Sequence, residues 1–210
     1  MTIAIPIKAI QLTAGSVISI HHLTWDDYET ILTELGESRC LRLTYYQGTL
    51  EIMSPLAIHE RPHRIIADIV KTLLDMEGRD WDDFGSTTFK RPKIAGVEPD
   101  TCFYIQNAAQ IRGCIHMDLE IYPPPDLVIE SDVTSLTNFD AYTAIGVPEI
   151  WIYNNNQLKI YIFENGNYKE VLNSPTFPNL SLVDMIPVWV QQAIERGASK
   201  MLKELRNQIS

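Results

Sequence analysis

Hydrophobic residues recur at helical spacing in four segments of the chain. The clearest is Ala57–Met76, where isoleucine, valine and leucine return every three or four residues. The segment before it begins after Thr24, which has the spacing of a capping box with Asp27, and it ends at Gly36. The predicted helices span residues 25–35, 57–76, 135–145 and 183–206.

Shorter apolar or alternating segments lie between these helices and predict strands. Gln47-Gly48 and Asn165-Gly166 are turn signals between neighbouring strands, and Pro125–Glu130 is a mostly apolar run with the pattern of a buried central strand. The predicted strands span residues 39–46, 49–53, 86–90, 99–105, 125–130, 147–153, 157–164 and 167–172. This order of elements predicts an α/β (α+β) fold built around one mixed sheet.

Length and charge narrow the class of protein. The chain has 210 residues, which fits a single domain over 1–210 with a C-terminal helix over 186–210. No apolar run is long enough for a membrane helix, and no secretory signal is recognisable. Three cysteines without CxxC spacing argue against disulfides or a thiolate zinc site, so we expect a cytoplasmic protein. A net charge of −10 disfavours nonspecific coating of nucleic acid.

Several carboxylates lie at predicted strand ends or near a helix start, where they could bind a metal ion together. Asp100 begins a predicted strand, Glu130 ends another, and Asp132 follows two residues later with its side chain toward the same side. Glu60 lies early on the long predicted helix. Carboxylates that converge at strand ends suit Mg²⁺ or Mn²⁺, which polarises a phosphoryl oxygen and lowers the pKa of bound water. Taken singly, each also fits a solvated strand end or, for Glu60, a favourable interaction with the helix dipole.

The combination of segments resembles the PD-(D/E)xK nuclease superfamily. More specifically, the chain is similar to a large bacterial family of restriction-endonuclease-like proteins, expanded in cyanobacteria and mostly of unknown function. The resemblance covers roughly residues 24–185. The matching segments are Tyr46–Glu60 (YQGTLEIMSPLAIHE), Gly96–Ile105 (GVEPDTCFYI), Pro123–Glu130 (PPPDLVIE), Tyr142–Trp151 (YTAIGVPEIW) and Ser174–Leu182 (SPTFPNLSL).

This resemblance implies a fold and a set of roles. The fold would be restriction-endonuclease-like, with a mixed central sheet flanked by helices. Asp100 and Glu130 would bind Mg²⁺ or Mn²⁺, and Glu60 would complete the site. Asp126, in the same PPPDLVIE segment, has a structural role in this interpretation. DNA would be the substrate, and cutting both of its strands favours a homodimer.

The chain departs from the superfamily at its lysine. Two residues after Glu130 the motif expects lysine, and this chain has Asp132. Relatives with a displaced lysine carry it on the next helix, at the position of Asn138. Lys90 or Arg91, on the strand before the motif aspartate, is the remaining candidate for a cation that orients water and offsets charge in the transition state.

Three functions therefore stay open. The first is a metal-dependent endonuclease that hydrolyses DNA phosphodiesters, for which Lys90, Arg91 and Lys93 could edge a groove beside the metal. The second is a catalytically weak or inactive member of the fold that serves as a binding or assembly module. The third is a metal hydrolase acting on another phosphate ester, which suits the acidic net charge.

Overall fold

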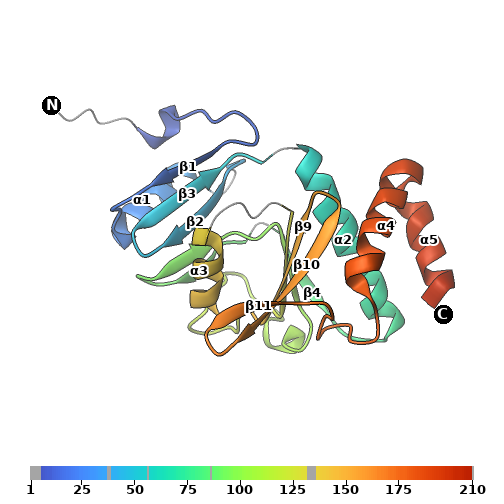
Figure 1. Ribbon diagram of the computed structural model, residues 1–210. Coiled ribbons are helices and arrows are strands. Elements are labelled where there is room, and N and C mark those ends of the chain that lie inside the picture. The colour runs from blue at the N-terminus through green and yellow to red at the C-terminus, as the bar shows by residue number, and fades with distance from the viewer. Residues whose placement is uncertain (1–5, 37–38, 56, 86, 132–135, 210) are drawn as a thin grey trace.

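The computed structural model describes most of the chain (Figure 1). The described residues are 6–36, 39–55, 57–85, 87–131 and 136–209. At residues 57–60 and 136–137 only the backbone is described. The mixed α/β class predicted from the sequence is confirmed, but the described strands form two sheets and not one.

The first sheet is antiparallel throughout, with strand order β1-β3-β2-β6-β5. Its strands are β1 (Val17–Ile20), β2 (Arg42–Tyr46), β3 (Thr49–Met53), β5 (Phe89–Arg91) and β6 (Ala95–Val97). The β2–β3 hairpin turns at Gln47 and Gly48, which both have positive φ, as a tight two-residue hairpin requires. The predicted hairpin is thus confirmed.

One face of this sheet is apolar and the other is polar. Helix α1 (Trp25–Leu35) covers the apolar face, where Tyr28 stacks on Tyr45 with ring centroids 4.9 Å apart. Thr24 caps α1 in the predicted capping box with Asp27. Because side chains alternate along a strand, neighbours of Tyr45 such as Thr44 point to the opposite face.

The second sheet has the strand order β11-β10-β9-β8-β7-β4. Its strands are β4 (Asp82–Phe84), β7 (Thr101–Tyr104), β8 (Leu127–Glu130), β9 (Glu149–Asn154), β10 (Gln157–Glu164) and β11 (Asn167–Val171). Only β8 and β9 run parallel, and α3 (Leu136–Ile145) makes the crossover between them. All other pairs in this sheet are antiparallel.

Helices cover the second sheet on both sides. On one side lie α2 (Ala57–Met76), α4 (Leu182–Arg196) and α5 (Ala198–Ile209), whose apolar faces share a core with β7 to β10 (Figure 1). On the other side, α3 packs against β2 and β6 of the first sheet and shares a second core with both sheets. Helix α3 therefore packs against both sheets and sets their relative orientation. Two short 3₁₀ turns, Ile7–Ala9 and Ala108–Gln110, complete the described elements.

The structure corrects the sequence reading at several points. The single C-terminal helix is two helices, because Gly197 ends α4 with a φ of 93° and the chain turns back. Strands β1, β4 and β6 were not predicted, since each is short or rich in small residues. The single sheet divides at Pro99, which has no N–H to continue a ladder. No helix among the described residues is long and apolar enough to cross a membrane.

Two buried carboxylates have plainly structural roles. Asp126, which the sequence interpretation excluded from the site, accepts hydrogen bonds from the backbone N–H groups of Ile105 (2.7 Å) and Asn107 (3.0 Å). Glu149 accepts from the indole of Trp151 (2.6 Å) and from the hydroxyl of Thr176 (2.6 Å). Each acid is surrounded by donors, which is how a buried carboxylate is stabilised. The predicted structural role of Asp126 is confirmed.

We predict that Gly96→Ala destabilises the protein by about 1–3 kcal/mol. A Cβ at Gly96 would lie 2.2 Å from Tyr28 Oη, and the fully buried Tyr28 ring has no room to retreat. Urea unfolding followed by circular dichroism measures the change. Gly85→Ala is the matched control, because its Cβ would meet no atom within 4 Å. Equal stability of the two variants would contradict the packing described for Tyr28.

Candidate active site

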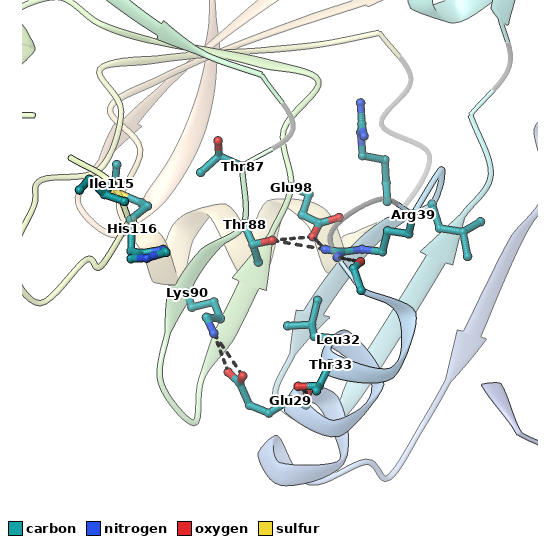
Figure 2. Close-up of a pocket in the computed structure, with 14 residues that line it drawn as sticks. Glu29, Leu32, Thr33, Arg39, Thr87, Thr88, Lys90, Glu98, Ile115 and His116 are labelled. Atoms are coloured by element: carbon teal, nitrogen blue, oxygen red, sulfur yellow. Dashed lines mark hydrogen bonds and ion pairs between the residues drawn. The ribbon is translucent and has the colours of Figure 1, made fainter. Parts of the chain in front are cut away.

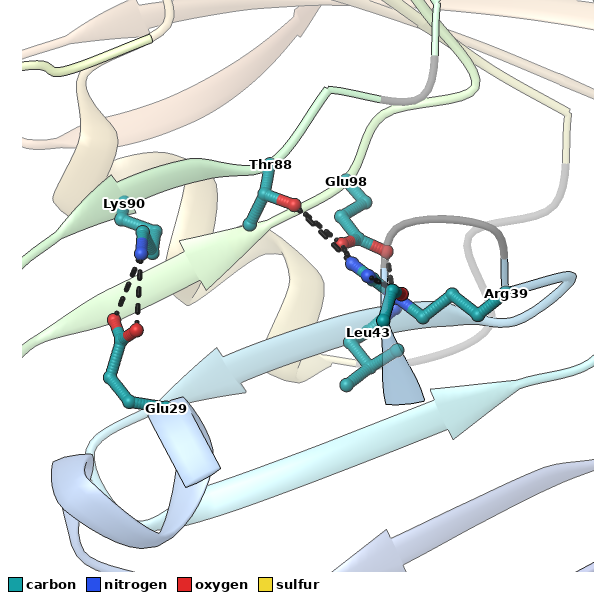
Figure 3. Close-up of polar contacts among 7 residues, drawn as sticks. Glu29, Arg39, Leu43, Thr88, Lys90 and Glu98 are labelled. Atoms are coloured by element: carbon teal, nitrogen blue, oxygen red, sulfur yellow. Dashed lines mark hydrogen bonds and ion pairs between the residues drawn. The ribbon is translucent and has the colours of Figure 1, made fainter. Parts of the chain in front are cut away.

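The chain passes from the first sheet to the second through Glu98, Pro99 and Asp100. Glu98 follows β6 and is held on the first sheet: it accepts from the backbone N–H of Leu43 (3.0 Å) and pairs with Arg39 (Figure 3). Thr88 donates its hydroxyl to the same carboxylate at 2.7 Å. Asp100 precedes β7 and so stands at the entrance to the second sheet.

Asp100 is held by the strand next to it. Its Oδ2 accepts from the backbone N–H (2.9 Å) and the hydroxyl (2.7 Å) of Ser131, which directly follows β8. Its Oδ1 lies 3.8 Å from Nε of Arg42, on β2 of the first sheet. Asp100 is only 8% exposed, so its charge is compensated largely by these neighbours.

Glu130 ends β8 beside Asp100. The hydroxyl of Tyr142, on α3, donates to Oε1, and the backbone N–H of Asp100 lies 3.3 Å from Oε2. Burial and the negative charge of Asp100 raise the pKa of Glu130 well above its ordinary value. The pKa of Tyr142 is also raised, by burial and then by the charge of Glu130, so the phenol stays protonated and keeps donating.

These groups meet at a small cleft of about 30 Å³ between the two sheets. That volume holds about two water molecules or a small ion. The residues that line it are Val17, Arg42, Thr44, Glu51, Met53, Glu98, Asp100, Glu130 and Asn138. Most of the cleft wall is therefore polar, and the first sheet contributes its polar face to it.

The structure brings together two of the predicted site residues, Asp100 and Glu130. Glu60 lies on the first turns of α2, and its side chain falls outside the described part of the structure, as does all of Asp132. Lys90 is on β5 and does not line the cleft; its ammonium lies 3.1 Å from both carboxylate oxygens of Glu29 on α1. Figure 2 shows this pair at the rim of a second, larger cavity.

Sequence reasoning missed three charged residues of the cleft, Arg42, Glu51 and Glu98. Arg42 is on β2 and the buried Glu51 is on β3, on the polar face of the hairpin. The sequence of the hairpin does contain a relevant pattern. One face of the hairpin is apolar, and the opposite face carries both acidic and basic side chains. Such a polar face becomes a buried polar site when other elements cover it. Helix α3 packs against β2, and Glu98, Asp100 and Glu130 line the same cleft; a pattern confined to the hairpin reveals none of these neighbours.

The paired carboxylates suit a hard divalent cation. Unlike Asp126 and Glu149, Asp100 and Glu130 face each other, and a cation between them would remove the repulsion that raises the pKa of Glu130. Among the described side chains, no three of His, Cys, Asp and Glu form a group that could hold a metal. A complete ligand set therefore needs a further donor beyond these two.

Comparison with known proteins places this chain in a family. The family model Uma2, described as "Putative restriction endonuclease", matches residues 25–195. The chain belongs to the Uma2 family. This confirms the superfamily inferred from the sequence segments, and the match includes Asp100 and Glu130. A search of curated proteins found no match.

A solved structure supports the same fold. It is described as a putative nuclease belonging to DUF820 from Anabaena variabilis, and it is 16% identical to this Uma2 protein with a TM-score of 0.55. The similarity covers 80% of this chain and 99% of the other. At that identity the likeness establishes a shared nuclease-like fold.

We predict that Glu130→Gln becomes more stable than the wild type as pH rises from the ordinary value of 4.5 toward neutrality, with EDTA present. A raised pKa in the folded state favours folding below the unfolded pKa, and this contribution is lost as pH rises through the folded pKa. The gain should approach about 1.4 kcal/mol per pH unit across that interval. Chemical unfolding at a series of pH values measures it.

The exposed Glu195→Gln serves as control for that series and should show no such trend. Parallel pH profiles for the wild type and Glu130→Gln would show that Glu130 ionises normally.

Proposed function

We propose that this Uma2 protein is an endonuclease that hydrolyses DNA phosphodiester bonds with Mg²⁺ or Mn²⁺. One observation carries the proposal: Asp100 and Glu130 stand side by side at the ends of neighbouring strands, buried in a polar cleft. Family membership supports it, since Uma2 is described as "Putative restriction endonuclease". Burial raises the pKa of Glu130, and a carboxyl group with a raised pKa beside a second carboxylate in a cleft marks a candidate functional site.

Asp100 and Glu130 would hold the metal in this proposal, with Glu60 from α2 as a further ligand. When bound, the ion supplies Lewis acidity toward a phosphoryl oxygen and lowers the pKa of an attacking water. The protein's own side chains set the geometry. Ser131 fixes one oxygen of Asp100, and Tyr142 fixes one oxygen of Glu130, so both carboxylates are oriented before any ligand arrives.

The surroundings of the cleft suit a phosphate-bearing substrate. A neighbouring cavity of about 800 Å³ is lined by Arg42, His116 and several threonines (Figure 2). Arg39 and Lys90 also line it, where they pair with Glu98 and Glu29. Such cationic and hydroxyl groups are those that contact the phosphates of DNA. The net charge of the protein is −10, so the chain as a whole repels DNA. The local positive charge of this cavity would therefore have to attract DNA to the site.

A second candidate function, a binding or assembly module without catalysis, is favoured by a specific observation. Asn138 lines the cleft at the position where relatives carry lysine, and an amide carries no charge. A hydrolase of another phosphate ester would use the same carboxylates. Cleavage of DNA separates both alternatives from the proposal.

We predict that Mn²⁺ raises the unfolding midpoint of the wild type and supports nicking of supercoiled plasmid. The ion should add about 2.7 kcal/mol at one hundred times its Kd, because it binds only the folded site. Asp100→Asn should abolish both effects, whereas Asp184→Asn, an exposed acid on α4, should preserve both. Thermal unfolding and gel electrophoresis are the measurements.

The possible results separate the three functions. A midpoint shift without cleavage of plasmid or linear DNA favours the hydrolase of another ester. Neither shift nor cleavage favours the binding module. An equal shift in Asp100→Asn would remove Asp100 from the metal site.

We also propose a two-fold dimer, because cutting both strands of a duplex requires two sites and two-fold pairing is the commonest symmetry of soluble oligomers. Sedimentation equilibrium at micromolar concentration should then give twice the 23.9 kDa of one chain. A mass of one chain, unchanged when duplex DNA is added, would contradict the dimer without affecting the assignment of the carboxylates.

A further inference from the structure

The cleft and the larger cavity are neighbours that share two wall residues, Arg42 and Glu98. The large cavity is roomy enough for part of a nucleic-acid strand, while the cleft holds little more than an ion and water. A phosphate bound in the large cavity would lie next to these two residues, on the side of the cleft that holds Asp100 and Glu130. Only one of the two shared wall residues is a cation.

Arg42 stands at this junction in a defined position. It is the first residue of β2, and its side chain is 14% exposed. Its Nε is 3.8 Å from Asp100 Oδ1, a separation that leaves the pair in electrostatic contact without a short hydrogen bond. The guanidinium is thus next to the carboxylates while it also faces the space from which a substrate arrives.

The other two basic residues that line the larger cavity, Arg39 and Lys90, each form an ion pair with a carboxylate of the same wall. Arg39 donates to the carbonyl of Gly36 at the end of α1 (2.7 Å) and pairs with Glu98 (Figure 3). It therefore links α1 to the segment Glu98–Asp100, where the chain passes from the first sheet to the second. Lys90 pairs with Glu29 (Figure 3), and neither residue lines the cleft. No further lysine or arginine lines either cavity in the part of the chain that the structure describes.

We infer that Arg42 contacts the phosphodiester at the carboxylate site and takes the electrostatic role of the absent lysine. This inference rests on the proposed function, since it assumes that the cleft receives a phosphate. The planar guanidinium donates two parallel N–H bonds to phosphate oxygens and offsets the negative charge that builds up there. Arginine stays protonated at working pH, so Arg42 transfers no proton and acts through charge and hydrogen bonds alone.

Binding of DNA without metal tests this contact directly. The probe is a short fluorescein-labelled duplex titrated in EDTA at several salt concentrations. Arg42→Gln should weaken binding about tenfold and reduce the slope of log K against log salt by about 0.9, the value for one phosphate contact. Arg42→Lys should keep the slope. Arg196→Gln, which removes an exposed cation paired with Glu204 on the far helices, is the control and should bind as the wild type does.

Cleavage with Mn²⁺ gives a second, independent readout. Arg42→Gln should lower kcat by about 10²–10³-fold with a smaller effect on KM. Adding Asn138→Lys to Arg42→Gln should restore much of the lost rate, because Asn138 lines the same cleft. If Arg42→Gln alone folds poorly, the double variant Arg42→Gln with Asn138→Lys is used for the same measurement, because it again has a positive charge in the cleft.

The outcomes separate this inference from the proposed function. An unchanged salt slope in Arg42→Gln, in a protein that cuts DNA, overturns the role of Arg42 and leaves the nuclease standing. A reduced slope in a protein that cuts no DNA upholds the contact and removes the catalysis. A loss of activity in Arg42→Gln that Asn138→Lys does not restore, with the slope unchanged, shows that Arg42 only supports the fold.

Discussion

The crossing at Glu98, Pro99 and Asp100 is the constraint on which the rest of the molecule depends. Glu98 is bonded to the first sheet through Leu43, Arg39 and Thr88, and two residues later Asp100 is bonded to the second sheet through Ser131. Pro99 stops either ladder from continuing. Because both acids are buried and hydrogen-bonded, the two sheets cannot slide past each other without leaving a buried carboxylate unpaired, which costs several kcal/mol.

Four carboxylates at the strand ends of the second sheet have two different roles. Asp126 and Glu149 are each surrounded by donors and hold loops against the second sheet. Asp100 and Glu130 have donors too, but they also face each other, and burial with this repulsion raises the pKa of Glu130. A fold selected only for stability would separate such a pair or replace one member. The contrast within one molecule is what distinguishes the site from ordinary buried polarity.

Sequence patterns predicted the elements that depend on local periodicity. Helices α1 and α2 and strands β3 and β10 have the predicted bounds, because capping residues, turn residues and apolar spacing all lie within the segment. The division into two sheets was missed, since it depends on which strands pair across long separations. Asp100 and Glu130 were found through family segments. Arg42 and Glu51 were missed because the residues that enclose them in the cleft, among them Asp100, Glu130 and Asn138, lie far along the chain from the hairpin.

The two halves of the cleft come from different sheets, and this arrangement explains how a missing lysine could be tolerated. The carboxylates belong to the second sheet, whereas Arg42 and Glu51 project from the polar face of the first. Helix α3 touches both sheets and also carries Tyr142 and Asn138, so the element that spaces the sheets is the one that would have carried the lysine. A cation brought by the facing sheet reaches the same small volume from the opposite wall. The proposed chemistry requires positive charge within a few ångströms of the reacting phosphate, and in this fold either wall of the cleft could supply it.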